Sequence, residues 1–184
     1  MLNYAEEIFW KGFWIEFGVE TKELEARNGF SYDLPKEEQI RAALYAYMRK
    51  MGEHVEVESD FKEKETDKVK GEADLRVLGD DALLLVEIKR TWAVSFWVNK
   101  YGEQLASWKA DMQKLEDMAV LQNKPTRKCF FLVVFFDSDK LFENVRLNEM
   151  ANYVQEKWGS SVAMFELDRF NFGNKSCRGY VWIR

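Results

Sequence analysis

Three side chains in two neighbouring strand-like segments have the types and spacing to do metal chemistry. Glu87 and Lys89 lie two positions apart in an otherwise apolar segment, and Asp74 lies in the segment before it. Charges in an apolar strand are costly unless they are paired or bound to a metal. Two neighbouring carboxylates repel each other, and a divalent cation such as Mg²⁺ relieves that repulsion. A lysine beside them could position or deprotonate an attacking water, or stabilise charge on a phosphate.

Strand alternation decides which of these side chains can meet. In residues 83–90, Glu87 and Lys89 point to the same face because successive side chains of a strand alternate. In residues 72–78, Asp74 points to one face, and the opposite face carries Ala73, Leu75 and Val77. A hairpin of the two segments, turning at residues 79–81, places Asp74 near Glu87 and Lys89.

Glu37 is a fourth candidate, at the start of a predicted helix. It lies three positions before Ile40 and therefore on the apolar face that points at the sheet, whereas Glu38 is rotated by about 100°. Two interpretations of Glu37 stay open: it caps the helix, or it is a further member of the carboxylate site. The Glu87–Lys89 pair alone is also typical of a solvated salt bridge, and Asp74 with the preceding helix favours the site.

Periodicity predicts the elements that must position these residues. Helices are predicted at residues 34–51, 99–121 and 146–158, the first ending at Gly52. Strands are predicted at residues 54–62, 72–78, 83–90, 129–136, 162–167 and 179–183. In the aromatic-rich residues 1–33, we expect a short helix followed by a strand at 13–19. The order of elements predicts an α/β (α+β) fold with helices covering a mixed sheet.

The chain resembles the PD-(D/E)XK nuclease superfamily, whose fold is called restriction-endonuclease-like. The resemblance consists of a helix with an inward Glu37, then Asp74 in the sequence GEAD, then Glu87-Ile88-Lys89. In the later helix, Gln104 stands where the RecB-like exonuclease branch has a glutamine. The chain departs from the pattern in having Trp108 where tyrosine is usual and Ala73 where the family name has proline.

The resemblance implies metal-dependent hydrolysis of phosphodiester bonds, most often in DNA. Asp74, Glu87 and the carbonyl of Ile88 would hold Mg²⁺, or alternatively Mn²⁺, and Lys89 would position or activate water. Glu37 would complete the metal shell or orient a metal-bound water, and Gln104 would steady the lysine or the phosphate. Further residues that could take part are the reserve ligand Glu72 and the phosphate contacts Arg76 and Arg90, although both arginines also fit a solvated position.

The resemblance covers residues 34–136, within a chain that we interpret as a single domain of residues 1–184. Residues 1–33 and 140–184 are then extra N- and C-terminal elements on the same core. Because many enzymes of this fold dimerise to cut both strands, a homodimer is a further expectation. The aromatic residues of 1–33 are interpreted as core or dimer contacts, with a base-stacking platform as the alternative.

Composition narrows the range of functions. With 27 Lys and Arg against 32 Asp and Glu, the net charge of −5 argues against binding nucleic acid by bulk electrostatics. Residues 62–70 are rich in lysine, but acidic residues dilute them. One histidine and two cysteines provide neither a zinc site nor a disulfide framework, and they favour the cytoplasm by default. The longest apolar run, residues 129–136, is too short for a membrane span, and the N-terminal residues lack the basic flank of a signal peptide.

Two other functional classes stay open at the level of sequence. The acidic charge and the aromatic N-terminal segment also fit a non-catalytic module of this fold that binds a protein or nucleic-acid partner. The third class is a plain α+β protein in which Glu87 and Lys89 pair on the surface. Mg²⁺-dependent cleavage of DNA would distinguish an enzyme from both alternatives.

Overall fold

A six-stranded mixed sheet forms the centre of the molecule. The computed structural model describes residues 7–28, 34–62, 69–92, 95–137, 145–159 and 161–184. The strands are β1 (His54–Lys62), β2 (Val69–Leu78), β3 (Leu83–Trp92), β4 (Thr126–Asp137), β5 (Ala163–Phe172) and β6 (Lys175–Ile183). The helices are α1 (Glu7–Asn28), α2 (Glu37–Lys50), α3 (Ser95–Val120) and α4 (Val145–Trp158). The strand order in the sheet is β1-β2-β3-β4-β6-β5.

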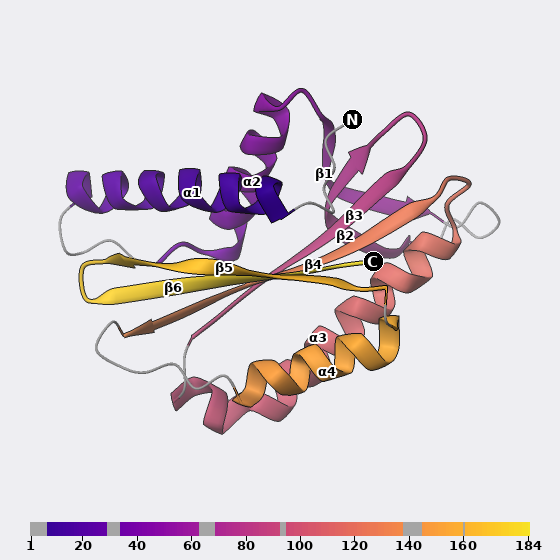
Figure 1. Cartoon of the computed structure of the whole chain (residues 1–184). Helices are drawn as coiled ribbons and strands as arrows, with labels where there is room; N and C mark the ends of the chain where they lie inside the picture. Colours follow the sequence, from indigo (N-terminus) through magenta and orange to yellow (C-terminus); the bar gives the residue numbers. More distant parts are fainter. Residues whose placement is uncertain (1–6, 29–33, 63–68, 93–94, 138–144, 160) are drawn as a thin grey trace.

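The helices cover both faces of the sheet, and each pair closes its own apolar core. On one face, α1 and α2 pack on strand residues that include Leu75, Val86 and Phe131. On the other face, α3 and α4 pack on residues that include Leu85 and Phe130 (Figure 1). The predicted mixed sheet flanked by helices is therefore confirmed.

The pairing of the strands explains why α3 crosses the sheet. β1, β2 and β3 pair antiparallel, as do β4, β6 and β5, whereas β3 and β4 pair in parallel. Parallel neighbours need a long crossover, and α3 provides it. β5 and β6 continue the same sheet beyond β4, so the C-terminal segment contributes strands to the central layer.

The N-terminal segment differs from its prediction, because α1 is one continuous helix and the strand expected at 13–19 is wrong. Five aromatic side chains at helical spacing face the sheet and are buried: Phe9, Trp10, Phe13, Trp14 and Phe17. Ile8 and Ile15 lie on the outer side, where they are 76% and 69% exposed, and these two residues hide the helical period in the sequence. Among the described residues, no helix is both long and apolar enough to cross a bilayer.

Turns and strand ends follow local signals, with one exception. Gly52, with φ of 87°, comes just after α2, as expected of a glycine past a helix C-terminus. The β2–β3 turn lies where it was predicted and closes with a hydrogen bond from Gly79 N–H to Ala82 C=O. β5 and β6 extend further toward each other than predicted, to a turn at Gly173. Charged residues near that turn, Asp168 and Arg169, are exposed and hide the strand signal.

Candidate active site

The sheet forks at the predicted site, because β2 leaves β3 there. Backbone pairing of the two strands runs from Leu78–Leu83 to Leu75–Val86. One residue further, the carboxylate of Asp74 accepts a hydrogen bond from the backbone N–H of Ile88, with Oδ2 at 2.7 Å from N. A side chain of β2 thus replaces the backbone partner that β3 would otherwise have.

Asp74 lies between the two layers rather than on one face. Leu75 belongs to the core under α1 and α2, but Ala73 belongs to the core under α3 and α4, so the predicted shared face of Ala73, Leu75 and Val77 is wrong. The simple alternation fails where β2 diverges from β3. The second carboxylate oxygen of Asp74 therefore reaches α2, where Arg41 Nη1 lies 3.2 Å away.

Lys89 connects acidic residues from three elements. Its Nζ lies 2.9 Å from Oε1 of Glu87, 3.3 Å from Oδ2 of Asp111 on α3 and 3.6 Å from Oε1 of Glu37 on α2. Because α2 and α3 cover opposite faces of the sheet, these contacts join the two layers at the fork. We call this group the carboxylate cluster; among the described residues it contains the acids Glu37, Asp74, Glu87 and Asp111 and the cations Arg41, Lys89 and Lys114.

Glu87 is the most deeply buried member of the carboxylate cluster. Only 3% of its side chain is exposed, and Nζ of Lys114 on α3 lies 2.6 Å from its Oε2. Burial and, after it, the neighbouring charge of Asp74 raise the pKa of Glu87 to about 7, although Lys89 and Lys114 act in the opposite direction. Glu87 is therefore poised to lose or keep its proton near neutral pH.

Lys89 remains an ammonium in this environment. Burial lowers its pKa, but the carboxylates of Glu87, Glu37 and Asp111 together outweigh burial, so the pKa of Lys89 ends above its ordinary value. A lysine with a raised pKa donates hydrogen bonds and does not remove a proton from water. The geometry therefore favours positioning and charge stabilisation over the base role considered from the sequence.

The structure decides between the two interpretations of Glu37. The N-terminus of α2 is capped by Gln39, whose Oε1 accepts a hydrogen bond from Lys36 N–H at 2.8 Å. Glu37 instead faces Lys89 and accepts a hydrogen bond from the backbone N–H of Arg90. Burial is the main cause that raises the pKa of Glu37. Glu37 thus belongs to the carboxylate cluster and not to the cap.

Gln104 lies beside the carboxylate cluster rather than in it. Its Nε2 donates to the hydroxyl of Thr91 at 3.1 Å, and Thr91 is two positions past Lys89 on β3. One turn further along α3, Trp108 is buried against Phe130 in the core. The glutamine predicted from the resemblance therefore faces the same strand as Lys89 but bonds to a neighbouring side chain.

Other predicted contacts have different positions. The guanidinium of Arg90 donates to the carbonyl of Pro35, and that of Arg76 pairs with Glu56. The side chain of Glu72 and most of residues 62–70 lie outside the described residues. His54 is exposed at the start of β1.

Sequence reasoning missed three members of the carboxylate cluster. They lie within helices, at the edge of the apolar face. Arg41 is next to the buried Ile40 on α2, and Asp111 is next to the buried Met112 on α3. Lys114 follows Asp111 by three positions and lies 3.7 Å from it. Acid–base pairs at this spacing beside an apolar face are the only signal, and they are equally typical of solvated helix surfaces.

The acids at the fork are of a residue type that Mg²⁺ takes as ligands, and each of them contacts a lysine or an arginine. Carboxylate oxygens and a backbone carbonyl are ligands that Mg²⁺ prefers. The N–H and C=O of one strand residue point to the same edge, so the carbonyl of Ile88 faces the fork as its N–H does. As the side chains stand, no three acidic, histidine or cysteine residues among those described converge as a metal-binding group.

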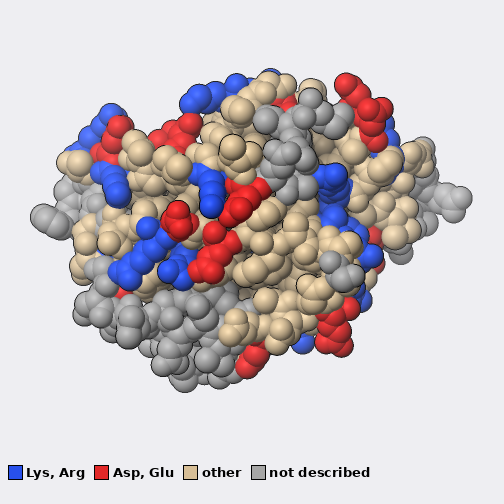
Figure 2. Space-filling view, viewed as in Figure 1, with Lys and Arg blue, Asp and Glu red and all other residues tan. Residues whose placement is uncertain are grey.

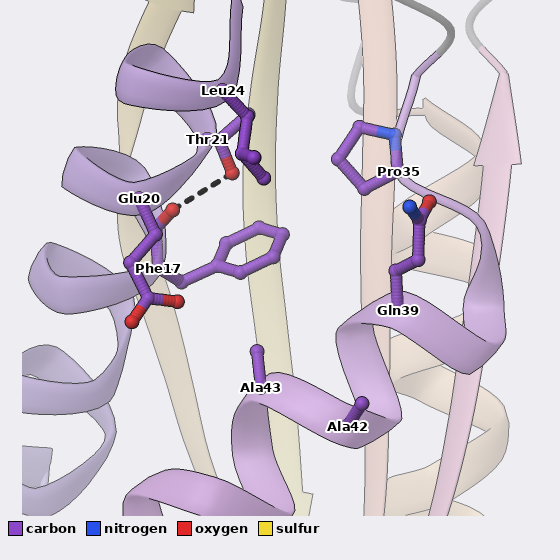
Figure 3. Close-up of a pocket in the computed structure, with 8 residues that line it drawn as sticks. All are labelled: Phe17, Glu20, Thr21, Leu24, Pro35, Gln39, Ala42 and Ala43. Carbon is purple, nitrogen blue, oxygen red and sulfur yellow. Dashed lines mark hydrogen bonds between the residues drawn. The ribbon is translucent and has the colours of Figure 1, made fainter.

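A pocket of about 230 Å³ between α1 and α2 is separate from the carboxylate cluster (Figure 3). Its lining is largely apolar and includes Phe17, Leu24, Pro35 and Ala43. Its Thr21 hydroxyl already donates to the carbonyl of Phe17. None of the described residues that line the pocket is a lysine or arginine, and this lining is unsuited to a phosphate.

Acidic and basic side chains are interspersed on the face of the molecule shown in Figure 2. This mixture agrees with the net charge of −5. On that face, the cations that could meet a phosphate are not gathered into a broad basic surface.

Comparison with protein-family models, curated proteins and solved structures finds no match for this chain. The resemblance to the nuclease superfamily therefore rests on the sequence motifs.

Proposed function

We propose that the chain is a metal-dependent nuclease of restriction-endonuclease-like fold that hydrolyses phosphodiester bonds, with DNA as its substrate. The observation that carries the proposal is the hydrogen bond from Ile88 N–H to Asp74 at the fork. It holds an acid of β2 against the stretch of β3 that contains Glu87 and Lys89, with Glu37 on the adjoining helix.

In this proposal, Asp74, Glu87 and the Ile88 carbonyl hold Mg²⁺ or Mn²⁺. When bound, the cation would supply positive charge beside the phosphate and Lewis acidity for the activation of water. The burial of Glu87 and its repulsion by Asp74 support this assignment, since a divalent charge offsets both.

The side chains around these ligands then have distinct tasks. Lys89, as an ammonium, donates a hydrogen bond to the attacking water or to a phosphate oxygen. Glu37 would orient Lys89 or the attacking water by accepting a hydrogen bond from it. Arg41 keeps the Asp74 carboxylate turned toward the fork through their contact of 3.2 Å.

The test is cleavage of linear, circular and branched DNA by the purified protein with Mg²⁺, with Mn²⁺ and with EDTA. We expect cleavage with either metal and none with EDTA. Asp74→Asn and Lys89→Ala should each lower the cleavage rate by at least about a hundredfold, because each removes a group that acts on the reacting atoms. An RNA substrate run in parallel tests the choice of DNA.

Matched controls are available in the ion pair of Asp137 and Lys175, whose side chains are part-buried and lie 2.6 Å apart. Asp137→Asn and Lys175→Ala remove the same charges away from the fork and should leave cleavage intact. Circular dichroism of every variant checks that it is folded. Undiminished cleavage by folded Asp74→Asn or Lys89→Ala protein would refute the proposal.

A specific observation favours a second candidate, a non-catalytic module of the same fold. Both oxygens of Glu87 already have ammonium partners, Lys89 at 2.9 Å and Lys114 at 2.6 Å, so the carboxylate cluster is also a self-contained ion-pair network. Such a module would be stable without metal and would bind its partner without cleaving it. The EDTA and Lys89→Ala arms of the cleavage assay separate the two candidates.

A further inference from the structure

Lys114 is one of the members of the carboxylate cluster that sequence reasoning missed, and it contacts the most deeply buried acid. It extends from α3 so that its Nζ lies 2.6 Å from Oε2 of Glu87 and 3.7 Å from Oδ1 of Asp111. Its side chain is 23% exposed, whereas that of Glu87 is 3% exposed. Lys114 therefore lies between solvent and a buried carboxylate oxygen.

Lys89 and Lys114 are anchored to different extents. Lys89 contacts Glu87, Asp111 and Glu37 within 3.6 Å and lies on the same strand as Glu87. Lys114 contacts Glu87 closely, and its second acid is more distant. A cation that enters between Asp74 and Glu87 would repel both ammonium groups. Lys114, which has fewer close acidic contacts than Lys89, would be displaced first.

We propose that Lys114 is an internal counter-ion that occupies Oε2 of Glu87 in the metal-free protein and is displaced when a divalent cation binds. This inference rests on the proposed metal site. It assigns Lys114 the task of keeping the buried Glu87 charge compensated until the cation arrives. The displaced ammonium remains tethered to α3 through a flexible side chain, where it is available to a phosphate of the substrate.

The proposal predicts a coupled change in stability and metal affinity. Lys114→Met keeps the length and packing of the side chain but removes its charge. Without metal, the variant should melt at a lower temperature than the natural protein, because Glu87 loses a close counter-ion. With the competing ammonium gone, its Kd for Mn²⁺ and Mg²⁺ should fall about tenfold, and saturating metal should abolish the difference in melting temperature.

Lys128 of β4, whose acidic partner is on the same helix as Lys114, provides the matched control. Its ammonium lies 2.9 Å from Glu116 of α3 and its side chain is 11% exposed, so it is a buried lysine in an acid pair outside the carboxylate cluster. Lys128→Met changes the net charge by the same amount. It should lose stability without any gain in metal affinity, and metal should not recover that loss.

The experiment is isothermal titration with MnCl₂ and MgCl₂ together with thermal unfolding of the full chain at one fixed pH. If Lys114→Met does not fold, Lys114→Gln serves the same comparison. Unchanged or weaker metal binding in the folded Lys114 variant overturns the inference, as does an equal gain in Lys128→Met. A Kd about tenfold lower in the Lys114 variant than in the natural protein, with no such gain in Lys128→Met, supports it.

The outcomes separate this inference from the proposed function. If the natural protein binds metal and cleaves DNA while the Lys114 variant binds metal equally well, only the role of Lys114 fails. If neither protein binds metal, the role of Lys114 and the proposed nuclease site fail together.

Discussion

At the scale of single residues, burying the ionised form of Glu87 costs folding free energy, which the rest of the fold must offset. Its pKa rises from 4.5 to about 7 because it is buried and faces Asp74. A carboxyl whose folded-state pKa is raised stabilises the protein below its unfolded pKa and loses that contribution as pH rises through its folded pKa. The loss occurs here between about pH 4.5 and pH 7 and amounts to roughly 3 kcal/mol.

We therefore predict that Glu87→Gln stabilises the metal-free protein at pH 8. The amide imitates the protonated acid, so the gain in unfolding free energy should approach roughly 3 kcal/mol at pH 8 and vanish near pH 4. Urea unfolding in EDTA at several pH values measures this difference. In Mg²⁺, the natural protein should gain stability and the variant should not.

A stability difference between Glu87→Gln and the natural protein that is constant from pH 4 to pH 8 would show that Glu87 does not titrate in this range.

At the scale of elements, the packing of α1 on the C-terminal strands depends on a glycine. A Cβ at Gly179 of β6 would lie 2.9 Å from Cδ1 of Leu167 and 3.2 Å from Cζ3 of Trp14. Trp14 also donates its indole N–H to the carbonyl of Asp168 on β5. Because Gly179 has no side chain, α1 can pack close to the sheet, which explains why a glycine lies inside a strand.

We predict that Gly179→Ala lowers the unfolding free energy by about 1–3 kcal/mol, the usual cost of overpacking a core. Gly102→Ala on α3 is the control, because its added Cβ meets no described heavy atom within 4 Å outside its own stretch of helix. In a helix, that change should stabilise by about 0.5–1 kcal/mol. Urea denaturation of both variants measures the effects. Equal stability of Gly179→Ala and the natural protein would mean that α1 shifts freely on the sheet.

At the scale of the whole molecule, the proposed function requires an acidic chain to approach an acidic polymer. The net charge is −5, and the carboxylate cluster offers only Arg41, Lys89 and Lys114 as local cations among the described residues. Phosphate attraction in the proposed function therefore depends on the bound metal and on few ion contacts. A protein that makes 6–10 phosphate contacts, by contrast, loses affinity for DNA steeply as the salt concentration rises.

We predict that DNA binding requires a divalent cation and responds weakly to monovalent salt. With about three phosphate contacts, the logarithm of the binding constant should fall with a slope near −3 against the logarithm of the salt concentration. Fluorescence anisotropy of labelled DNA in Ca²⁺, which also takes oxygen ligands, measures this slope. A slope near −8, or tight binding in EDTA, would indicate an extended basic surface and contradict the prediction.

Much of the fold followed from local patterns. Apolar periodicity located α2, α3 and α4, and alternation in β3 placed Glu87 and Lys89 on one face, because these signals depend on neighbours in the chain. The same local rules failed in α1, where the exposed Ile8 and Ile15 obscured a helical face. They also failed at Ala73, where β2 leaves the sheet.

The sequence by itself determined the acids and the lysine of β2 and β3 and the glutamate at the start of α2. Only the tertiary structure decided that Asp74 replaces a backbone partner of Ile88, that Glu37 faces Lys89 rather than the helix cap, and that α3 adds Asp111 and Lys114. The physical reason is that these contacts join opposite layers of the molecule. They depend on where β2 diverges and how two helices pack, which no pattern of neighbouring residues encodes.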